Sequence, residues 1–71
     1  MKYLFSLHYN SEGVTELVSV EAENEIQAGN ILASKYMPKI TEISYRPFVR
    51  AMEKLDIIVE SLGLMKIKEL S

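Results

Sequence analysis

The sequence predicts a small α+β domain with the element order ββαβαβ, in which a mixed four-stranded sheet carries two helices on one face. Apolar residues alternate with polar ones over 2–9 and 14–21, which predicts two strands. Helical apolar spacing predicts helices over 24–36 and 48–62. A chain of 71 residues has room for one core, so we expect residues 1–71 to form a single domain.

The first two strands should form a hairpin. Residues 10–13, Asn-Ser-Glu-Gly, are typical of a turn, and Gly13 is free to adopt a positive φ. A four-residue loop fixes the register and places the aromatic row of the first strand on the valine face of the second. The expected pairs are Tyr9 with Val14, Leu7 with Glu16, Phe5 with Val18, and Tyr3 with Val20.

The first helix, expected over 24–36, has a start signal and a stop signal. Asn24 can cap the free N–H groups of the first turn, and Gln27 can reach back in the manner of a capping box. Pro38 should end the helix because it forces the preceding residue out of the helical region. The expected inward stripe is Ala28, Ile31, Leu32 and Tyr36.

Residues 39–46 are interpreted as a third strand, with Thr41, Ile43 and Tyr45 facing inward. One helix would then join it to the second strand, which predicts a parallel pair with a right-handed crossover.

The second helix, expected over 48–62, starts after Pro47 and should end at Gly63 in a left-handed conformation. Residues 64–70 either prolong this helix or form a short fourth strand, and we prefer the strand because Lys66 and Lys68 suit an edge. The wide apolar face of the helix comprises Phe48, Ala51, Met52, Leu55, Ile58, Val59 and Leu62.

Composition narrows the function classes. The net charge is −2 and there is no cysteine, so the sequence offers neither a disulfide nor a thiolate metal site, which fits a reducing cytoplasm. The apolar N-terminal run is too short and polar for a signal peptide, and no stretch approaches a membrane span.

The sequence contains no recognisable catalytic or metal motif. His8 is the only histidine, and a general base needs a positioned partner. Asp56 and Glu60 lie one helical turn apart and could hold a divalent ion weakly, but such a pair is more typical of a solvated helix face. The three glycines are isolated, so they form no phosphate-binding loop. We therefore expect no cofactor, no metal and no enzymatic activity, with a small enzyme or enzyme subunit kept as one alternative.

A second alternative is a nucleic-acid accessory protein. Arg50 and Lys54 lie four residues apart on one edge of the expected second helix, and Arg46 lies just before it begins. These three residues would contact a polyanion. The aromatic residues beside them, Tyr45 and Phe48, point inward by periodicity, and the chain as a whole is acidic.

Apolar residues expected on the outside favour a protein partner or a homodimer. Leu4 and Leu17 face away from the core row of the hairpin, Ile26 lies on the outer arc of the first helix, and Ile57 on that of the second. The competing interpretation is that end residues fold back over these positions. The acidic run that includes Glu21, Glu23 and Glu25 serves either as a further contact surface or as a solubilising, dipole-complementing one.

Residues 20–28, VEAENEIQA, follow a hairpin and precede a short strand. This segment resembles small α+β proteins encoded by phages and mobile elements, including some anti-CRISPR inhibitors. The resemblance implies a non-enzymatic inhibitor that occludes a larger host complex, with the acidic run as its first contact surface. The small net charge favours steric blocking over imitation of DNA.

Overall fold

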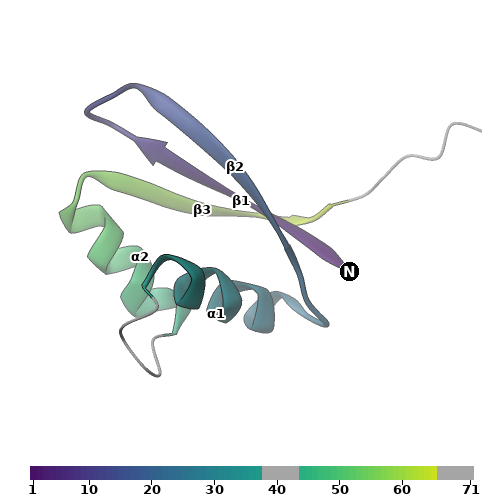
Figure 1. Ribbon diagram of the computed structural model, residues 1–71. Helices are drawn as coiled ribbons and strands as arrows, with labels where there is room; N and C mark the ends of the chain where they lie inside the picture. The colour runs from purple at the N-terminus through teal and green to yellow at the C-terminus, as the bar shows by residue number, and fades with distance from the viewer. Residues whose placement is uncertain (38–43, 66–71) are drawn as a thin grey trace, which may run out of the picture.

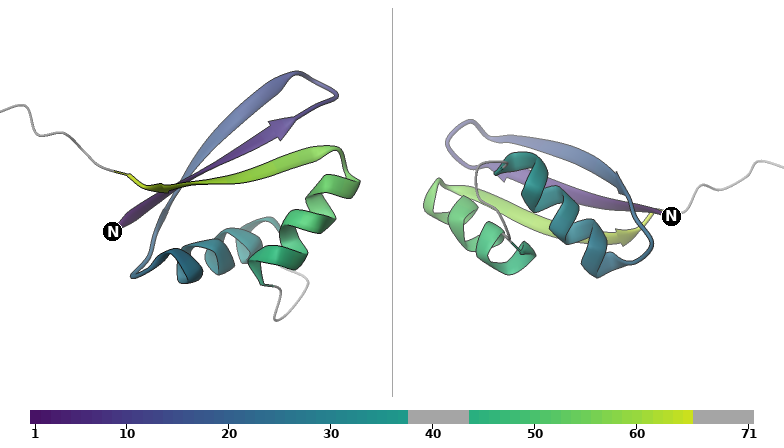
Figure 2. Two further views of the ribbon diagram at one scale, coloured as in Figure 1. Left: turned by 180° about the vertical axis from the view of Figure 1, so that it is seen from behind. Right: turned by 60° about the horizontal axis from the view of Figure 1, so that its bottom comes forward.

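The computed structural model describes residues 1–37 and 44–65 and shows an α+β fold of two layers, a sheet above a pair of helices (Figure 1). The elements are β1 (Lys2–Tyr9), β2 (Val14–Glu21), α1 (Glu25–Tyr36), α2 (Tyr45–Lys54) and β3 (Ile57–Leu64). The strand order is β2-β1-β3, and β1 pairs antiparallel with both neighbours. Both helices lie on the same side of the sheet (Figure 2).

The hairpin has the predicted register. Tyr9 pairs with Val14, Phe5 with Val18 and Tyr3 with Val20. Gly13 has a φ of 66° and its N–H donates to the Tyr9 carbonyl at 2.8 Å, which closes the turn. The turn chemistry and the alternation of side chains were therefore sufficient to define this half of the sheet.

Helix α1 is capped as expected. The Asn24 side chain accepts a hydrogen bond from the Gln27 N–H at 2.8 Å, and the Gln27 side chain accepts one from the Glu23 N–H at 2.7 Å. The inward stripe is rotated from the predicted one, because α1 packs against α2 as well as the sheet. Ala33, which is not in the predicted inward stripe, is fully buried, whereas Ile31, which is in it, is exposed.

The predicted third strand is wrong at its C-terminal end, where Tyr45 and Arg46 open helix α2. Ser44, also in the predicted strand, is the N-cap of α2, and residues 39–43 lie outside the described part of the chain. Pro47 falls in the first turn of α2, where a missing N–H is not needed. Tyr45 still points toward the core, but it does so from a helix.

The predicted second helix is too long. Helix α2 ends at Lys54, and a turn at Leu55 and Asp56 leads directly into β3. Asp56 has a φ of 64°, which reverses the chain, and Gly63, with a φ of 83°, lies within β3 instead of ending a helix. The residues placed inward by helical spacing but found exposed are Leu55, Ile58 and Leu62.

Residues 57–64 become a strand because they also satisfy strand spacing and β1 has a free edge to pair with. Ile57 and Val59 alternate with Ile58 and Glu60, and β-branched side chains favour a pleated surface. Pairing with β1 supplies a full ladder of backbone hydrogen bonds, with a β-bulge opposite Leu4 and Phe5.

The sheet therefore has three antiparallel strands among the described residues, not the predicted mixed four. Strands β2 and β3 run in the same direction but lie on opposite sides of β1, so the two helices together make the crossover beneath it. Of the predicted fourth strand, 64–70, Leu64 is the end of β3 and residues 66–70 lie outside the described part of the chain.

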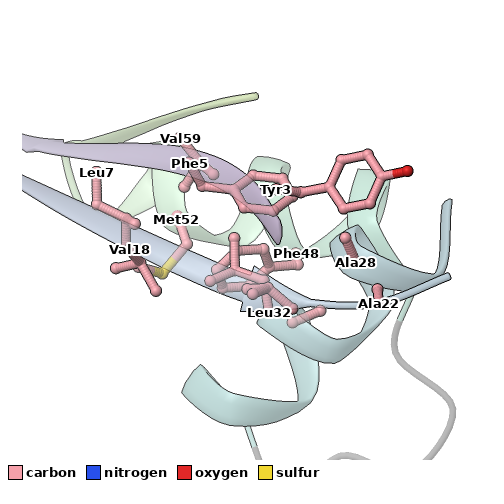
Figure 3. Close-up of a cluster of buried hydrophobic side chains, with 12 residues drawn as sticks. Tyr3, Phe5, Leu7, Val18, Ala22, Ala28, Leu32, Phe48, Met52 and Val59 are labelled. Carbon is pink, nitrogen blue, oxygen red and sulfur yellow. The ribbon is translucent and has the colours of Figure 1, made fainter. Parts of the chain in front are cut away.

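The core fills the space between the sheet and the helices (Figure 3). The largest fully buried side chains are Phe5, Leu7, Leu32 and Phe48. The Tyr45 ring packs 5.7 Å from the Phe5 ring, and the Tyr36 ring stacks 6.0 Å from that of Phe48. Each layer thus contributes aromatic rings to one interior, and the opposite side of the sheet takes no part in it.

Candidate interaction surface

Within residues 1–37 and 44–65, no helix or strand covers the side of the sheet that faces away from α1 and α2 (Figure 2). Side chains alternate along each strand. Tyr3, Phe5, Leu7 and the residues paired with them across the sheet therefore point toward the helices, and the residues between them along each strand point away. We call the side that turns away the open face, and pairing across β1 sets its rows. From β2 through β1 to β3 these rows are Thr15–His8–Ile58, Leu17–Ser6–Glu60 and Ser19–Leu4–Gly63.

The open face mixes apolar side chains with hydroxyl groups. Leu17 is 62% exposed and Ile58 is 44% exposed, while Leu4 on the central strand is half-buried between its neighbours. Ser6 and Ser19 lie beside them, and Glu60 is the single charge in these three rows. Such a surface can bury apolar area against another protein and still satisfy hydrogen bonds at the contact.

His8 lies on the open face and is engaged locally. Its Nδ1 atom is 2.7 Å from the Thr15 hydroxyl oxygen, directly across the strand pair. Within residues 1–37 and 44–65, no three His, Asp or Glu side chains gather as metal ligands.

The predicted interface residues lie in three different places. Leu4 and Leu17 share the open face, as expected. Ile26 protrudes from α1 and is 79% exposed, on the helix layer. Ile57, predicted on the outer arc of a helix, is instead half-buried on β3, opposite Tyr9 and against the core, because its segment is a strand.

The acidic residues follow the bend from β2 into α1. Glu21 ends β2 and accepts a hydrogen bond from the N-terminal ammonium group at 3.1 Å. Glu23 precedes the Asn24 cap, and Glu25 opens the helix and accepts a hydrogen bond from the Ser61 hydroxyl at 3.0 Å. These carboxylates are at the positive end of the α1 dipole, and each is exposed.

A groove of about 470 Å³ lies where α1 and α2 begin. Phe5, Gly29 and Tyr45 form an apolar floor, with Glu25 and Arg46 among the polar groups around it. The Tyr45 N–H donates to the Asn30 side chain at 3.2 Å, which fixes the start of α2 against α1. Burial, and then the charges of Glu25 and Glu60, raise the pKa of Tyr45 above its ordinary value of 10.0, which favours the neutral phenol.

The predicted basic surface is interrupted by acids. Arg46 and Arg50 lie one turn apart on α2, but they line the same shallow groove as Glu53 and Glu60. Lys54 is in the last turn of α2 and does not line this groove. The carboxylates beside the guanidinium groups would repel a phosphate backbone, so the geometry gives no support to polyanion binding.

Glu16 is the centre of a hydrogen-bonded cluster that was not predicted from the sequence. Its Oε1 atom accepts from the Tyr36 hydroxyl at 2.9 Å and from the Tyr9 hydroxyl at 3.2 Å, which ties the hairpin to the end of α1. Burial, followed by the hydrogen bond to Glu16, raises the pKa of Tyr36 to about 12. The predicted hairpin register could have indicated this cluster, because the pairing of Leu7 with Glu16 puts a carboxylate on the aromatic side of the sheet.

Comparison with known proteins assigns no family to the chain, since no family model, curated protein or solved structure matches it. In the described residues, the two helices are too short and polar to cross a membrane.

Proposed function

We propose that the chain is a non-enzymatic protein-interaction module that binds a partner through its open face. The observation that carries this proposal is a sheet covered by helices on one side only, with Leu4, Leu17 and Ile58 on the other. Two of these three side chains are well exposed, and burying them against a partner removes apolar area from water.

The area of the open face determines how far the contact with a partner must extend. Three strands about 4.8 Å apart and eight residues long at about 3.3 Å per residue cover roughly 380 Å² in projection. Stable complexes bury about 800 Å² on each partner. The partner must therefore extend past the open face, and the exposed acidic bend from Glu21 to Glu25 is the adjoining surface at one end of β2.

The narrower form of the proposal concerns who the partner is. The resemblance of residues 20–28 to phage-encoded inhibitors makes a host defence complex the first partner to test. The exposed carboxylates of Glu23 and Glu25 would then meet a basic surface of that complex, and the bulk of the domain would block access to it.

The test uses three matched substitutions of exposed apolar residues by lysine. Leu17→Lys and Ile58→Lys place a charge on the open face, and Ile26→Lys places one on α1 as the control. A photo-crosslinking residue at position 58 identifies the partner, and its affinity is then measured for the purified variants. We expect Leu17→Lys and Ile58→Lys to weaken binding by about tenfold or more and Ile26→Lys to leave it unchanged. Binding lost only with Ile26→Lys would place the interface on α1 and refute the proposal.

A further inference from the structure

The outer edge of β2 presents backbone groups whose direction can be read from the hairpin. The Ala22 N–H donates to the Met1 carbonyl at 2.9 Å, so even-numbered residues of β2 hydrogen-bond to β1. On the other side of β1, the Lys2 carbonyl accepts from Met65 and the Asn10 N–H donates to Asp56, which confirms the alternation. The residues whose N–H and C=O groups point outward from β2 are therefore Thr15, Leu17, Ser19 and Glu21.

This edge keeps only one of the features that usually prevent strands from pairing, the charged side chains of Glu16 and Glu21. Between Val14 and Glu21 there is no proline, glycine, lysine or bulge, and the strand pairs regularly with β1 over its whole length. Within the described residues, no backbone group of the outward set has a hydrogen-bond partner. The other edge, β3, is different, because a bulge and the positive φ of Gly63 distort it.

We infer that two copies of the chain pair antiparallel through the free edges of β2, joining two three-stranded sheets into one of six strands. A twofold axis perpendicular to the sheet relates antiparallel copies of one strand, so residues pair even with even and odd with odd. Because odd residues pair with odd residues, the outward backbone groups of the two strands meet. Because the axis is perpendicular to the sheet, all four helices lie on the same side of it.

The register follows from the count of outward groups and from charge. Centring the pair on Val18 puts Leu17 opposite Ser19 of the second copy and Thr15 opposite Glu21 of the second copy, so all four outward residues find partners. Glu16 then faces Val20 of the second copy. A pair centred on Glu16 would oppose two carboxylates, and a pair centred on Leu17 or Ser19 leaves one outward residue beyond the ladder.

A second copy fits this edge because the outward residues of its own β2 supply the matching backbone N–H and C=O groups. Leu17, the most exposed apolar side chain of β2, comes to lie diagonally beside Leu17 of the second copy. The inference goes beyond the proposed function, because it uses the edge of the sheet and leaves the rest of the open face free.

Amide hydrogen exchange of the full chain, at low micromolar and at millimolar concentration, tests the pairing together with sedimentation mass. We expect the N–H groups of Thr15, Leu17, Ser19 and Glu21 to exchange about tenfold more slowly at the higher concentration, with a dimer mass. The N–H groups of Val18 and Val20 serve as internal controls, since β1 already protects them at both concentrations. Exchange independent of concentration and a monomer mass at millimolar concentration would overturn the inference.

Two variants separate the edge from the open face. Ser19→Pro removes one outward N–H at an edge position, where proline is tolerated, and should give a monomer whose Val18 amide remains protected. Ile58→Lys changes the open face and should still dimerise. A dimer that survives Ser19→Pro but not Ile58→Lys would mean that copies associate face to face. Failure of the proposed function is a separate result, because it appears as partner binding that Ile58→Lys does not weaken.

Discussion

At the scale of single residues, one contact fixes α1 to the sheet and another fixes the two helices to each other. Glu16 holds the hydroxyl groups of Tyr9 and Tyr36 and so joins the end of α1 to the hairpin. Gly29 lets the Tyr45 ring lie directly against α1, since a Cβ atom there would be 2.9 Å from the ring. Neither contact involves the open face, so both can be altered without touching the proposed binding surface.

The Glu16 contact makes stability depend on pH in the alkaline range. The pKa of Tyr36 is raised from 10.0 to about 12 in the folded chain, first by burial and then by the hydrogen bond to Glu16. The folded state therefore favours the neutral phenol, and this stabilisation is fully present below pH 10 and is lost as the pH rises toward 12. Urea unfolding at a series of pH values should show stability falling through this window.

Replacing Glu16 by glutamine tests the cause of the shift. The variant should lower the pKa of Tyr36 only part of the way toward 10.0, because burial, the larger cause, remains. The ring resonances of Tyr36, followed by NMR during an alkaline titration, measure it, with Glu53→Gln on the exposed side of α2 as the control. An unchanged titration curve would remove Glu16 from the explanation.

Gly29→Ala should destabilise the fold although alanine favours helix. The helix gains about 1 kcal/mol of propensity, but the added methyl group pushes the Tyr45 ring out of place, and overpacking of this kind costs about 1–3 kcal/mol. We expect Gly29→Ala to lower the free energy of unfolding in urea by about 1 kcal/mol. The same substitution made in a Tyr45→Ala background should lower it by less, relative to Tyr45→Ala alone. Ser34→Ala, on the exposed side of α1, is the matched control and should change stability by less than about 0.5 kcal/mol. A Gly29→Ala variant more stable than the parent chain would contradict the packing.

At the scale of elements, the first half of the chain could be predicted and the second half could not. Local signals determine the hairpin and α1: a glycine turn, alternating side chains and an Asn24 cap with Gln27 behind it. The segment 57–64 satisfies both helical and strand spacing, so sequence alone does not decide its state. The free edge of β1 decides it, and that is tertiary information.

The candidate surface divides in the same way. Leu4 and Leu17 could be placed because the hairpin register was known, and they lie on the open face as expected. Ile58 was assigned to a buried helix face and Ile57 to an exposed one, and the strand reverses both assignments. Which residues complete the surface therefore depended on an element whose type the sequence left undetermined.

The turn at Asp56 is where the chain changes from helix to strand. Asp56 has a φ of 64°, and its side chain accepts a hydrogen bond from that of Asn10 at 3.1 Å. Alanine tolerates this conformation poorly, so Asp56→Ala should cost about 1–2 kcal/mol in thermal or urea unfolding. Asp56→Gly loses the hydrogen bond but relieves the backbone, and should cost less. Were the segment a continuous helix, the order would be reversed, since alanine would stabilise it and glycine would weaken it.

At the scale of the whole molecule, the described residues form a three-stranded sheet with two helices on one side, and the other side and the edge of β2 are the surfaces that the two proposals use. The proposed binding to a partner protein and the inferred pairing of two copies use different parts of this arrangement. Both depend on β3 being a strand beside β1, because that strand completes the open face with Ile58 and makes β2 the regular edge.

Nuclear Overhauser contacts in solution test this arrangement most directly. The account predicts cross-strand contacts from His8 to Thr15 on one side and from His8 to Ile58 on the other, with none from either helix to Leu17. Helical chemical shifts over residues 57–64, or contacts between Leu17 and α1 or α2, would contradict it.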